Sequence, residues 1–303
     1  MDRETWPQPP SVRTIAVVNQ KGGVGKSTTA VSLGSWLAHH GSRVLVVDLD
    51  PQANATTGLG IDPRRIRSSI YEAIVEGAPM EDCIEPTSLK GLFCVPSTID
   101  LAGAEIELVP AFSREYRLKN ALAPILEDFG YIFIDCPPAL GLLTINALAV
   151  AHEVIVPVQC EYYALEGLGQ LLRNVSMVRS NLNPELKVQS FLLTMYDART
   201  KLAAQVADEV RNHFPGEVYA ETIPRSVKLS EAPSFGQPIS LYAPTSKGGR
   251  AYEEAAREVA EQNLSFQSEP SSPSGKEADT DPVTVPGGIT SEPTRDKEAI
   301  NDD

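Results

Sequence analysis

The stretch VVNQKGGVGKSTT, residues 17–29, has the residue types and the spacing of a loop that binds phosphate. The usual pattern is a glycine, four residues and then Gly-Lys-Ser/Thr, and it ends as expected at Lys26 and Ser27. Its first glycine would be residue 20, which is Gln20, and a second lysine, Lys21, follows directly. The motif therefore predicts a phosphate-binding loop with one lysine more than the usual pattern contains.

Each residue type in this loop has a separate task in holding a nucleotide. Glycines let the backbone turn its N–H groups toward a phosphate, and a helix that starts at Ser27 adds its positive N-terminal end. Lys26 is expected to reach the β and γ phosphates, and the Ser27 hydroxyl is expected to ligate Mg²⁺. The predicted nucleotide contacts in the loop are Lys21, Gly22, Gly23, Val24, Gly25, Lys26, Ser27 and Thr28.

Three aspartates follow apolar runs and are candidates to hold the metal and the attacking water. Asp135 comes after YIFI and is placed to supply the second carboxylate that a hydrated metal needs. Asp48 and Asp50 end the run RVLVVDLD. Asp50 lies nearer the carboxyl edge of this run, so we expect it to orient or deprotonate water and Asp48 to support the metal indirectly. The predicted metal set is Ser27, Asp50 and Asp135, mostly through water.

Short apolar runs, rich in β-branched residues, alternate with helical patterns over residues 12–263. Runs that are apolar on both faces are typical of buried parallel strands. The strands are expected at 14–20, 43–50, 131–138, 153–160 and 188–197, with further strands at 91–97 and 217–224. Helices are expected at 27–40, 69–76, 114–128, 142–149, 165–180, 201–212 and 247–263. The alternation predicts a doubly wound α/β fold, with a mostly parallel sheet flanked by helices and ligands at the carboxyl ends of its strands.

Composition predicts one folded region between two polar ends. The chain has 303 residues, of which 42% are hydrophobic, and a net charge of −14. Residues 1–11 are expected to form a flexible leader and residues 12–263 one large α/β domain with the phosphate loop. Residues 264–303 are expected to form a disordered acidic tail. The sequence shows neither a signal peptide nor a membrane-spanning run. Four scattered cysteines fit reduced thiols in a cytoplasmic protein.

Several longer motifs together resemble the chromosomal ParA/Soj family of ATPases, whose phosphate loop departs from the usual pattern. The resemblance covers about residues 13 to 262, and its motifs are KGGVGKST, VVDLDPQANATTGLG, IDCPPALGLLTINAL, EYYALEGL, LLTMYDART and IPRSVKLSEAPSFGQPI. It implies a DNA-segregation ATPase of the cytoplasm, associated with the nucleoid, that uses ATP and Mg²⁺ and forms a homodimer when ATP is bound. The implied partners are non-specific double-stranded DNA and a ParB-like protein that stimulates hydrolysis.

The resemblance also assigns roles to single residues. Lys21 matches the family lysine that reaches across the dimer to phosphates of the other subunit, which accounts for the missing glycine at position 20. Lys21, Lys26 and Asp50 form the implied catalytic set, and Asp135 matches the second carboxylate. Glu161 falls where the family makes dimer contacts to the nucleotide, and two residues fall where it lines the adenine, Met195 and Pro224.

Basic residues that the family uses for DNA lie in two stretches. Non-specific binding depends on lysine and arginine near phosphates, so local charge matters more than the total. Residues 222–250 hold four bases and one acid. The candidate DNA contacts are Arg199, Lys201, Arg225, Lys228, Lys247 and Arg250.

Two other function classes remain open from the sequence. A MinD-like ATPase that positions a machine on a membrane would need a basic amphipathic C-terminal helix, whereas this C-terminus is acidic and Pro-rich. A protein that uses nucleotide only as a switch, with little turnover, would share the same loop. We expect no contact with membranes and weak hydrolysis without the partner.

Overall fold

The computed structural model describes residues 5–161 and 166–266, and these residues contain one seven-stranded sheet. Its order is β3-β4-β2-β5-β1-β6-β7, and every pair is parallel except β3 with β4. The strands are β1 (Arg13–Val17), β2 (Val44–Asp48), β3 (Glu85–Pro86), β4 (Leu92–Val95), β5 (Tyr131–Asp135), β6 (Glu153–Gln159) and β7 (Lys187–Thr194). The predicted fold class is confirmed, and β1, β2 and β5 are neighbours whose carboxyl ends meet at one edge.

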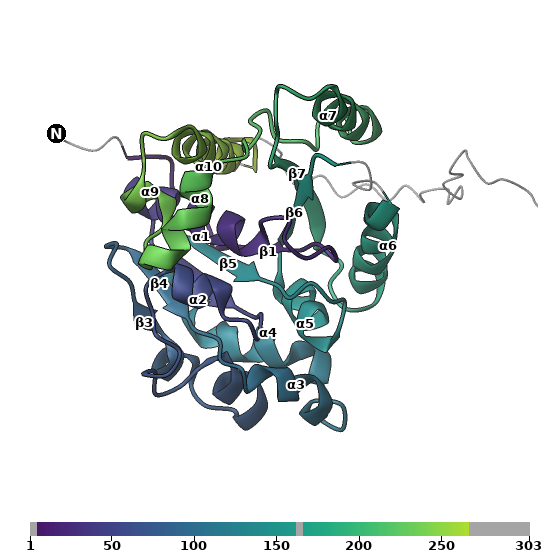
Figure 1. Cartoon of the computed structure of the whole chain (residues 1–303). Coiled ribbons are helices and arrows are strands. Elements are labelled where there is room, and N and C mark those ends of the chain that lie inside the picture. The colour runs from purple at the N-terminus through teal and green to yellow at the C-terminus, as the bar shows by residue number, and fades with distance from the viewer. Residues whose placement is uncertain (1–4, 162–165, 267–303) are drawn as a thin grey trace, which may run out of the picture. The chain divides into compact units, whose positions relative to one another are not determined.

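Ten α-helices within the described residues connect and cover these strands (Figure 1). They are α1 (Lys26–His39), α2 (Asn54–Gly58), α3 (Leu101–Glu107), α4 (Arg117–Leu122), α5 (Leu142–Val150), α6 (Glu166–Asn181), α7 (Lys201–His213), α8 (Val227–Glu231), α9 (Ile239–Tyr242) and α10 (Lys247–Phe266). Helices α1 and α10 pack on one face of the sheet, and α3 to α7 contribute to the core on the other face. None of the described helices is long and apolar enough to span a bilayer.

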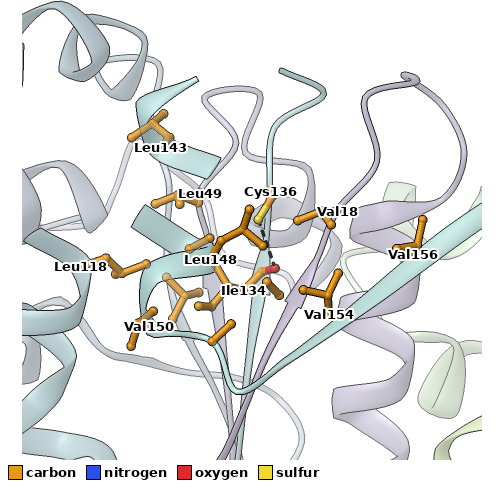
Figure 2. Close-up of a cluster of buried hydrophobic side chains, with 14 of the residues drawn as sticks. Val18, Leu49, Leu118, Ile134, Cys136, Leu143, Leu148, Val150, Val154 and Val156 are labelled. Atoms are coloured by element: carbon orange, nitrogen blue, oxygen red, sulfur yellow. Dashed lines mark hydrogen bonds between the residues drawn. The ribbon is translucent and has the colours of Figure 1, made fainter. Parts of the chain in front are cut away.

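Alternate residues of each central strand point to opposite faces, so each face has its own apolar core. In β1, Ile15 belongs to the core beneath α1 and α10, whereas Ala16 belongs to the core on the other side. Figure 2 shows part of the second core, where Ile134 of β5, Val154 of β6 and Leu148 of α5 lie together. The two cores fix the strands that carry the loops of the site.

Two predicted elements differ from the structure. Residues 217–224 form no regular strand; they pair with β7 and with Tyr196 beyond its end through isolated contacts, the bridges Phe191 with Val218 and Tyr196 with Pro224 and a hydrogen bond from Ile223 N–H to the Leu193 oxygen at 2.8 Å. A contact with a distant part of the chain interrupts the strand, because the backbone N–H groups of residues 220 and 221 donate to the Glu258 carboxylate at 3.0 Å each. The predicted helix 114–128 is a short α-helix between two 3₁₀ turns, the second with a proline at its start.

The structure differs from the predicted domain limits at both ends of the folded region. The leader is packed where it is described: Trp6 is buried, and its ring stacks on His40 of the α1 end with centroids 3.7 Å apart. Burial of a large aromatic surface outweighs the freedom expected of this segment. Helix α10 runs to Phe266, past the predicted limit at residue 263, and the tail from residue 267 on lies outside the described residues.

Candidate nucleotide-binding site

The loop between β1 and α1 has the backbone conformation that phosphate binding requires. Gly23 and Gly25 have φ angles of 73° and 94°, a region that favours glycine. Helix α1 starts at Lys26, and no side chain caps its N-terminus. Its first N–H groups and the positive end of its dipole therefore face the site, an arrangement that suits a phosphate.

The two lysines of the loop lie in opposite environments. Lys26 is only 6% exposed, and its Nζ donates to the backbone oxygen of Lys21 at 3.3 Å. Burial lowers the pKa of Lys26, and the charges of Asp135 and Asp50 oppose that shift. The Lys21 side chain is 44% exposed and lies on the rim of the site. Lys26 thus lies within the pocket, whereas Lys21 lies on its rim, 3.3 Å from the Glu161 carboxylate.

Asp135 ends β5 and is fully buried beside the loop. It lies opposite Val17 of β1 and Asp48 of β2 in the sheet register. Neither of its carboxylate oxygens has a hydrogen-bond partner of good geometry among the described residues. Burial, and after it the charge of Asp48, raise the pKa of Asp135 well above its usual value, and the nearby Ser27 side chain acts in the opposite direction.

This environment fits a divalent cation. A buried carboxylate without a hydrogen-bond partner is costly unless a charge satisfies it, and the Ser27 side chain is the one that a phosphate loop uses to ligate Mg²⁺. The described residues contain no group of three or more His, Cys, Asp or Glu that could hold a metal ion by themselves. A cation here would therefore need oxygens from the nucleotide and from water.

Asp48 and Asp50 have different surroundings, as expected, and the contacts of Asp48 show that it holds a loop. Its carboxylate accepts from the backbone N–H and the hydroxyl of Thr56 at 2.8 and 2.7 Å, and from the backbone N–H of Asp50 at 3.1 Å. Burial raises the pKa of Asp48 to about 6. Asp48 thus fixes the loop that carries Asp50, and Asp50 itself lines the cavity in front of the phosphate loop.

Two adjoining cavities open beside the phosphate loop. The first, about 370 Å³, is lined by the loop glycines, Lys26, Ser27, Thr28 and Asp50, and by Leu229, Ala232, Pro233 and residues 237–239. The second, about 430 Å³, is lined by Thr194, Met195, Pro224 and Tyr252 among others. Gly25, Thr28 and Met195 line both cavities. The structure thus brings the two predicted adenine residues to the same end of the site, beyond the phosphate loop.

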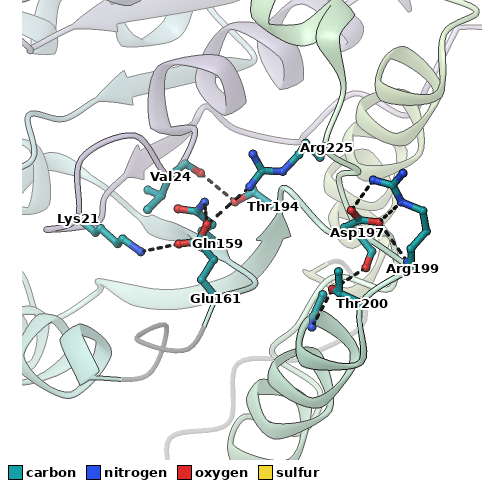
Figure 3. A network of polar contacts seen from close by, with 10 residues as sticks. Lys21, Val24, Gln159, Glu161, Thr194, Asp197, Arg199, Thr200 and Arg225 are labelled. Atoms are coloured by element: carbon teal, nitrogen blue, oxygen red, sulfur yellow. Dashed lines mark hydrogen bonds and ion pairs between the residues drawn. The ribbon is translucent and has the colours of Figure 1, made fainter.

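Glu161 also lies at this site, on the rim that carries Lys21 (Figure 3). Its carboxylate is 3.3 Å from the Lys21 Nζ and 3.6 Å from the Arg225 guanidinium. Its predicted contact with a nucleotide across a dimer remains a prediction. In this structure it joins the phosphate loop to the segment just before α8, which carries Arg225.

All six predicted DNA contacts are exposed, but three already face carboxylates. Arg199 holds Asp197 at 2.7 Å, Lys228 holds Glu231 at 2.8 Å, and Arg225 approaches Glu161. The others are Lys201, Lys247 and Arg250, at the starts of α7 and α10. Packing of Gly248 against Leu229 brings the α10 start beside α8, which carries Lys228.

Sequence reasoning missed residues that shape the site from a distance along the chain. Thr194, which ends β7, donates its hydroxyl to the backbone oxygen of Val24 at 2.9 Å and so braces the phosphate loop. Gln237, Pro238 and Ile239 line the first cavity. The quoted motif at 223–239 covers the last three, but nothing local marks Thr194 as a loop contact.

Comparisons with known proteins agree with this geometry. A family profile described as an AAA domain matches residues 12–188. Sporulation initiation inhibitor protein Soj of Bacillus subtilis is 55% identical over 82% of this chain and 98% of its own. Chromosome partitioning protein ParA of Myxococcus xanthus is 52% identical over 82% of this chain and 87% of its own.

A solved structure whose name differs from Soj and ParA has the same fold as this chain. Cobyrinic acid a,c-diamide synthase from Mycobacterium smegmatis, with bound ADP and magnesium, superposes with a TM-score of 0.73 at 42% identity. The match covers 85% of this chain and 96% of that one. The nucleotide and the metal in that structure are the two ligands that the cavities and Asp135 suit here.

Proposed function

Because the chain belongs to the Soj/ParA family of chromosome-partitioning ATPases, we propose that its ATP-bound dimer binds DNA and releases it after hydrolysis. ATP and Mg²⁺ are the cofactors of this activity, as the bound ADP and magnesium of the related structure support. The observation that carries the proposal is the contrast between the two lysines of one loop. Lys26 is buried within its own site, whereas Lys21 is exposed at its rim.

Within one subunit, this chain's residues would hold the nucleotide and prepare water for attack. The loop amides and Lys26 would bind the phosphates, and Ser27 and Asp135 would hold the cation, the latter through water. Bound Mg²⁺ would neutralise charge on the phosphates. Asp50, held by Asp48 through its backbone N–H, would orient the attacking water. Met195 and Pro224 would line the base.

Lys21 would complete the site of a second copy. Two nucleotides that face each other concentrate negative charge between two subunits, and a lysine from each side offsets it. An exposed lysine on the rim can reach outward with little cost in desolvation, which a buried lysine cannot. ATP would then act as the ligand that joins two subunits, and ADP would not.

DNA binding would follow from dimerisation. One subunit presents a small group of bases, several of them beside carboxylates, which implies weak binding by a monomer. A dimer would double the contacts to phosphate, and affinity that depends on several phosphate contacts rises steeply with their number. A ParB-like partner would stimulate hydrolysis and so end the DNA-bound state. DNA binding by the ATP dimer would associate the protein with the nucleoid between these events.

Retention on DNA with different nucleotides tests the proposal. Full-length protein is mixed with a DNA duplex of arbitrary sequence and ATP, ADP or no nucleotide, and bound DNA is measured by gel shift. Retention with ATP alone is expected. Equal retention in all three conditions would contradict a dimerisation switch. The MinD-like alternative differs in what the ATP dimer binds, so sedimentation with liposomes in the same conditions separates the two.

A further inference from the structure

Glu161 is shared by two cations from distant parts of the chain. Its Oε2 lies 3.3 Å from the Lys21 Nζ and its Oε1 lies 3.6 Å from the Arg225 guanidinium. The Gln159 amide also donates to Oε1, at 2.5 Å (Figure 3). The Lys21, Glu161 and Arg225 side chains are 44%, 46% and 61% exposed, so all three can move. Because Arg225 also attracts the Glu161 carboxylate, the attraction between this carboxylate and Lys21 is weaker than in an isolated pair.

The backbone of Arg225 is fixed at a point from which its side chain reaches this carboxylate. Its backbone N–H donates to the oxygen of Tyr196 at 3.1 Å. Another carboxylate that feels the charge of Arg225, that of Asp197, is already held by Arg199 through two hydrogen bonds of 2.9 and 2.7 Å. Arg225 therefore has Glu161 as its ion-pair partner in the described part of the chain.

Glu161 and Arg225, which form an ion pair with each other, have opposite effects on Lys21. A carboxylate attracts the lysine to a position within its own subunit, and a guanidinium on the same carboxylate repels the lysine and competes for the negative charge. Loss of Glu161 should release Lys21, whereas loss of Arg225 should leave the whole carboxylate to Lys21 and hold it more tightly.

We propose that Glu161 holds Lys21 within its own subunit and that Arg225 is a positioning residue that weakens this hold, so that Lys21 can reach phosphate bound by a second copy. This inference rests on the proposed function, in which Lys21 acts across a dimer. It gives Arg225 a part in the nucleotide cycle that is separate from contact with DNA.

The test measures the ATP concentration that gives half-maximal dimer, by light scattering with Mg²⁺ and without DNA. Glu161→Gln should lower this concentration and Arg225→Gln should raise it, each roughly two- to fivefold, as for an exposed ion pair. The double variant should behave like Glu161→Gln, because Arg225 acts through that carboxylate. Arg225→Lys, which keeps the charge, should lie near the unchanged protein.

A merely structural role predicts another result, in which both single variants weaken dimerisation. That outcome overturns the proposal, and so does a stronger dimer with Arg225→Gln. Arg64→Gln, which removes an exposed arginine paired with Asp62 at 2.9 Å, is the matched control and should leave the concentration unchanged. Thermal unfolding shows that each variant is folded.

Lys21→Ala separates failure of this inference from failure of the proposed function. If Lys21→Ala still forms the ATP dimer, Lys21 does not act across it, and both claims fall. If Lys21→Ala abolishes the dimer while Glu161→Gln and Arg225→Gln change nothing, the proposed function stands and the shared carboxylate has no such role.

Discussion

Two regions of one site differ in how they hold charge. The floor, defined by Lys26, Asp135 and Asp48, is buried at the carboxyl ends of β2 and β5 and the start of α1. The rim, defined by Lys21, Glu161 and Arg225, is about half exposed. Charges on the floor are expensive to leave unpaired, whereas exposed ion pairs are worth little and exchange partners easily. The floor therefore suits permanent nucleotide contacts, and the rim suits contacts that form only when a second subunit arrives.

The largest expected effect on nucleotide binding comes from removing the lysine of the floor. Lys26→Ala should weaken ATP binding by about ten- to a hundredfold, because a charge-assisted contact to phosphate is lost from a buried position. Titration with a fluorescent ATP analogue measures this. An unchanged affinity for ATP would contradict the role of Lys26 in binding phosphate.

Asp135 should strengthen Mg²⁺-dependent ATP binding while it lowers the free energy of unfolding of the protein without nucleotide. In Asp135→Asn, Mg²⁺ should no longer strengthen ATP binding, which is expected to fall by about tenfold. The same variant without nucleotide should be more stable near pH 7, by on the order of 1 kcal/mol, because a buried group without a hydrogen-bond partner is no longer charged.

The sign of that change follows from the pKa of Asp135, which is raised in the folded protein. A raised carboxyl pKa gives stability that is present at low pH and is lost as pH rises through the folded value. Chemical unfolding at pH 5 and pH 7 should therefore show a smaller loss of stability in Asp135→Asn than in the unchanged protein. A less stable variant at pH 7 would contradict this account of the floor.

Asp50 is as buried as Lys26 of the floor, and its loss should stop the cycle after assembly. Asp50→Ala should bind ATP and dimerise, yet release phosphate at least about a hundredfold more slowly, because the group that orients water is missing. The dimer should then stay on DNA. A phosphate-release assay with DNA present checks this, and undiminished release would contradict the role of Asp50.

The smallest effects are expected for the exposed bases beyond the rim. Lys228→Gln and Arg199→Gln should each weaken DNA binding by the ATP dimer and lower its dependence on salt by about one phosphate contact per subunit. Because both bases already face carboxylates, the loss should be modest. Dimerisation by ATP should not change, in contrast to the variants of Arg225.

The floor could be predicted from sequence further than the rim could. A phosphate loop between a strand and a helix has a local pattern, and an aspartate at the end of an apolar run marks Asp135. The task of Asp48 was not predictable in the same way, because it depends on how the chain turns back to bring Thr56 to the carboxylate. Asp48 was expected to support the metal, and the structure shows it holding this loop.

On the rim, contacts join residues that are far apart in the chain. Lys21 and Glu161 are 140 positions apart, and the family motifs mark each residue singly without showing that they touch. The irregular segment at 217–224 escaped prediction for a similar reason, since Glu258 of α10 takes its backbone N–H groups. Periodicity reports the faces of an element and says nothing of such distant competitors.

The central claim is that Lys26 serves its own subunit and Lys21 serves the other, and mixing two variants tests it most directly. Lys21→Ala keeps Lys26 in its own site but lacks the lysine that would reach the partner's site. Lys26→Ala keeps Lys21 for the partner's site but lacks the lysine of its own site. ATP hydrolysis is measured with DNA for each variant and for their mixture. We predict that neither variant hydrolyses ATP alone and that the mixture does, since one site of each mixed dimer is complete. A mixture that stays inactive, although light scattering shows dimers in it, would contradict the claim.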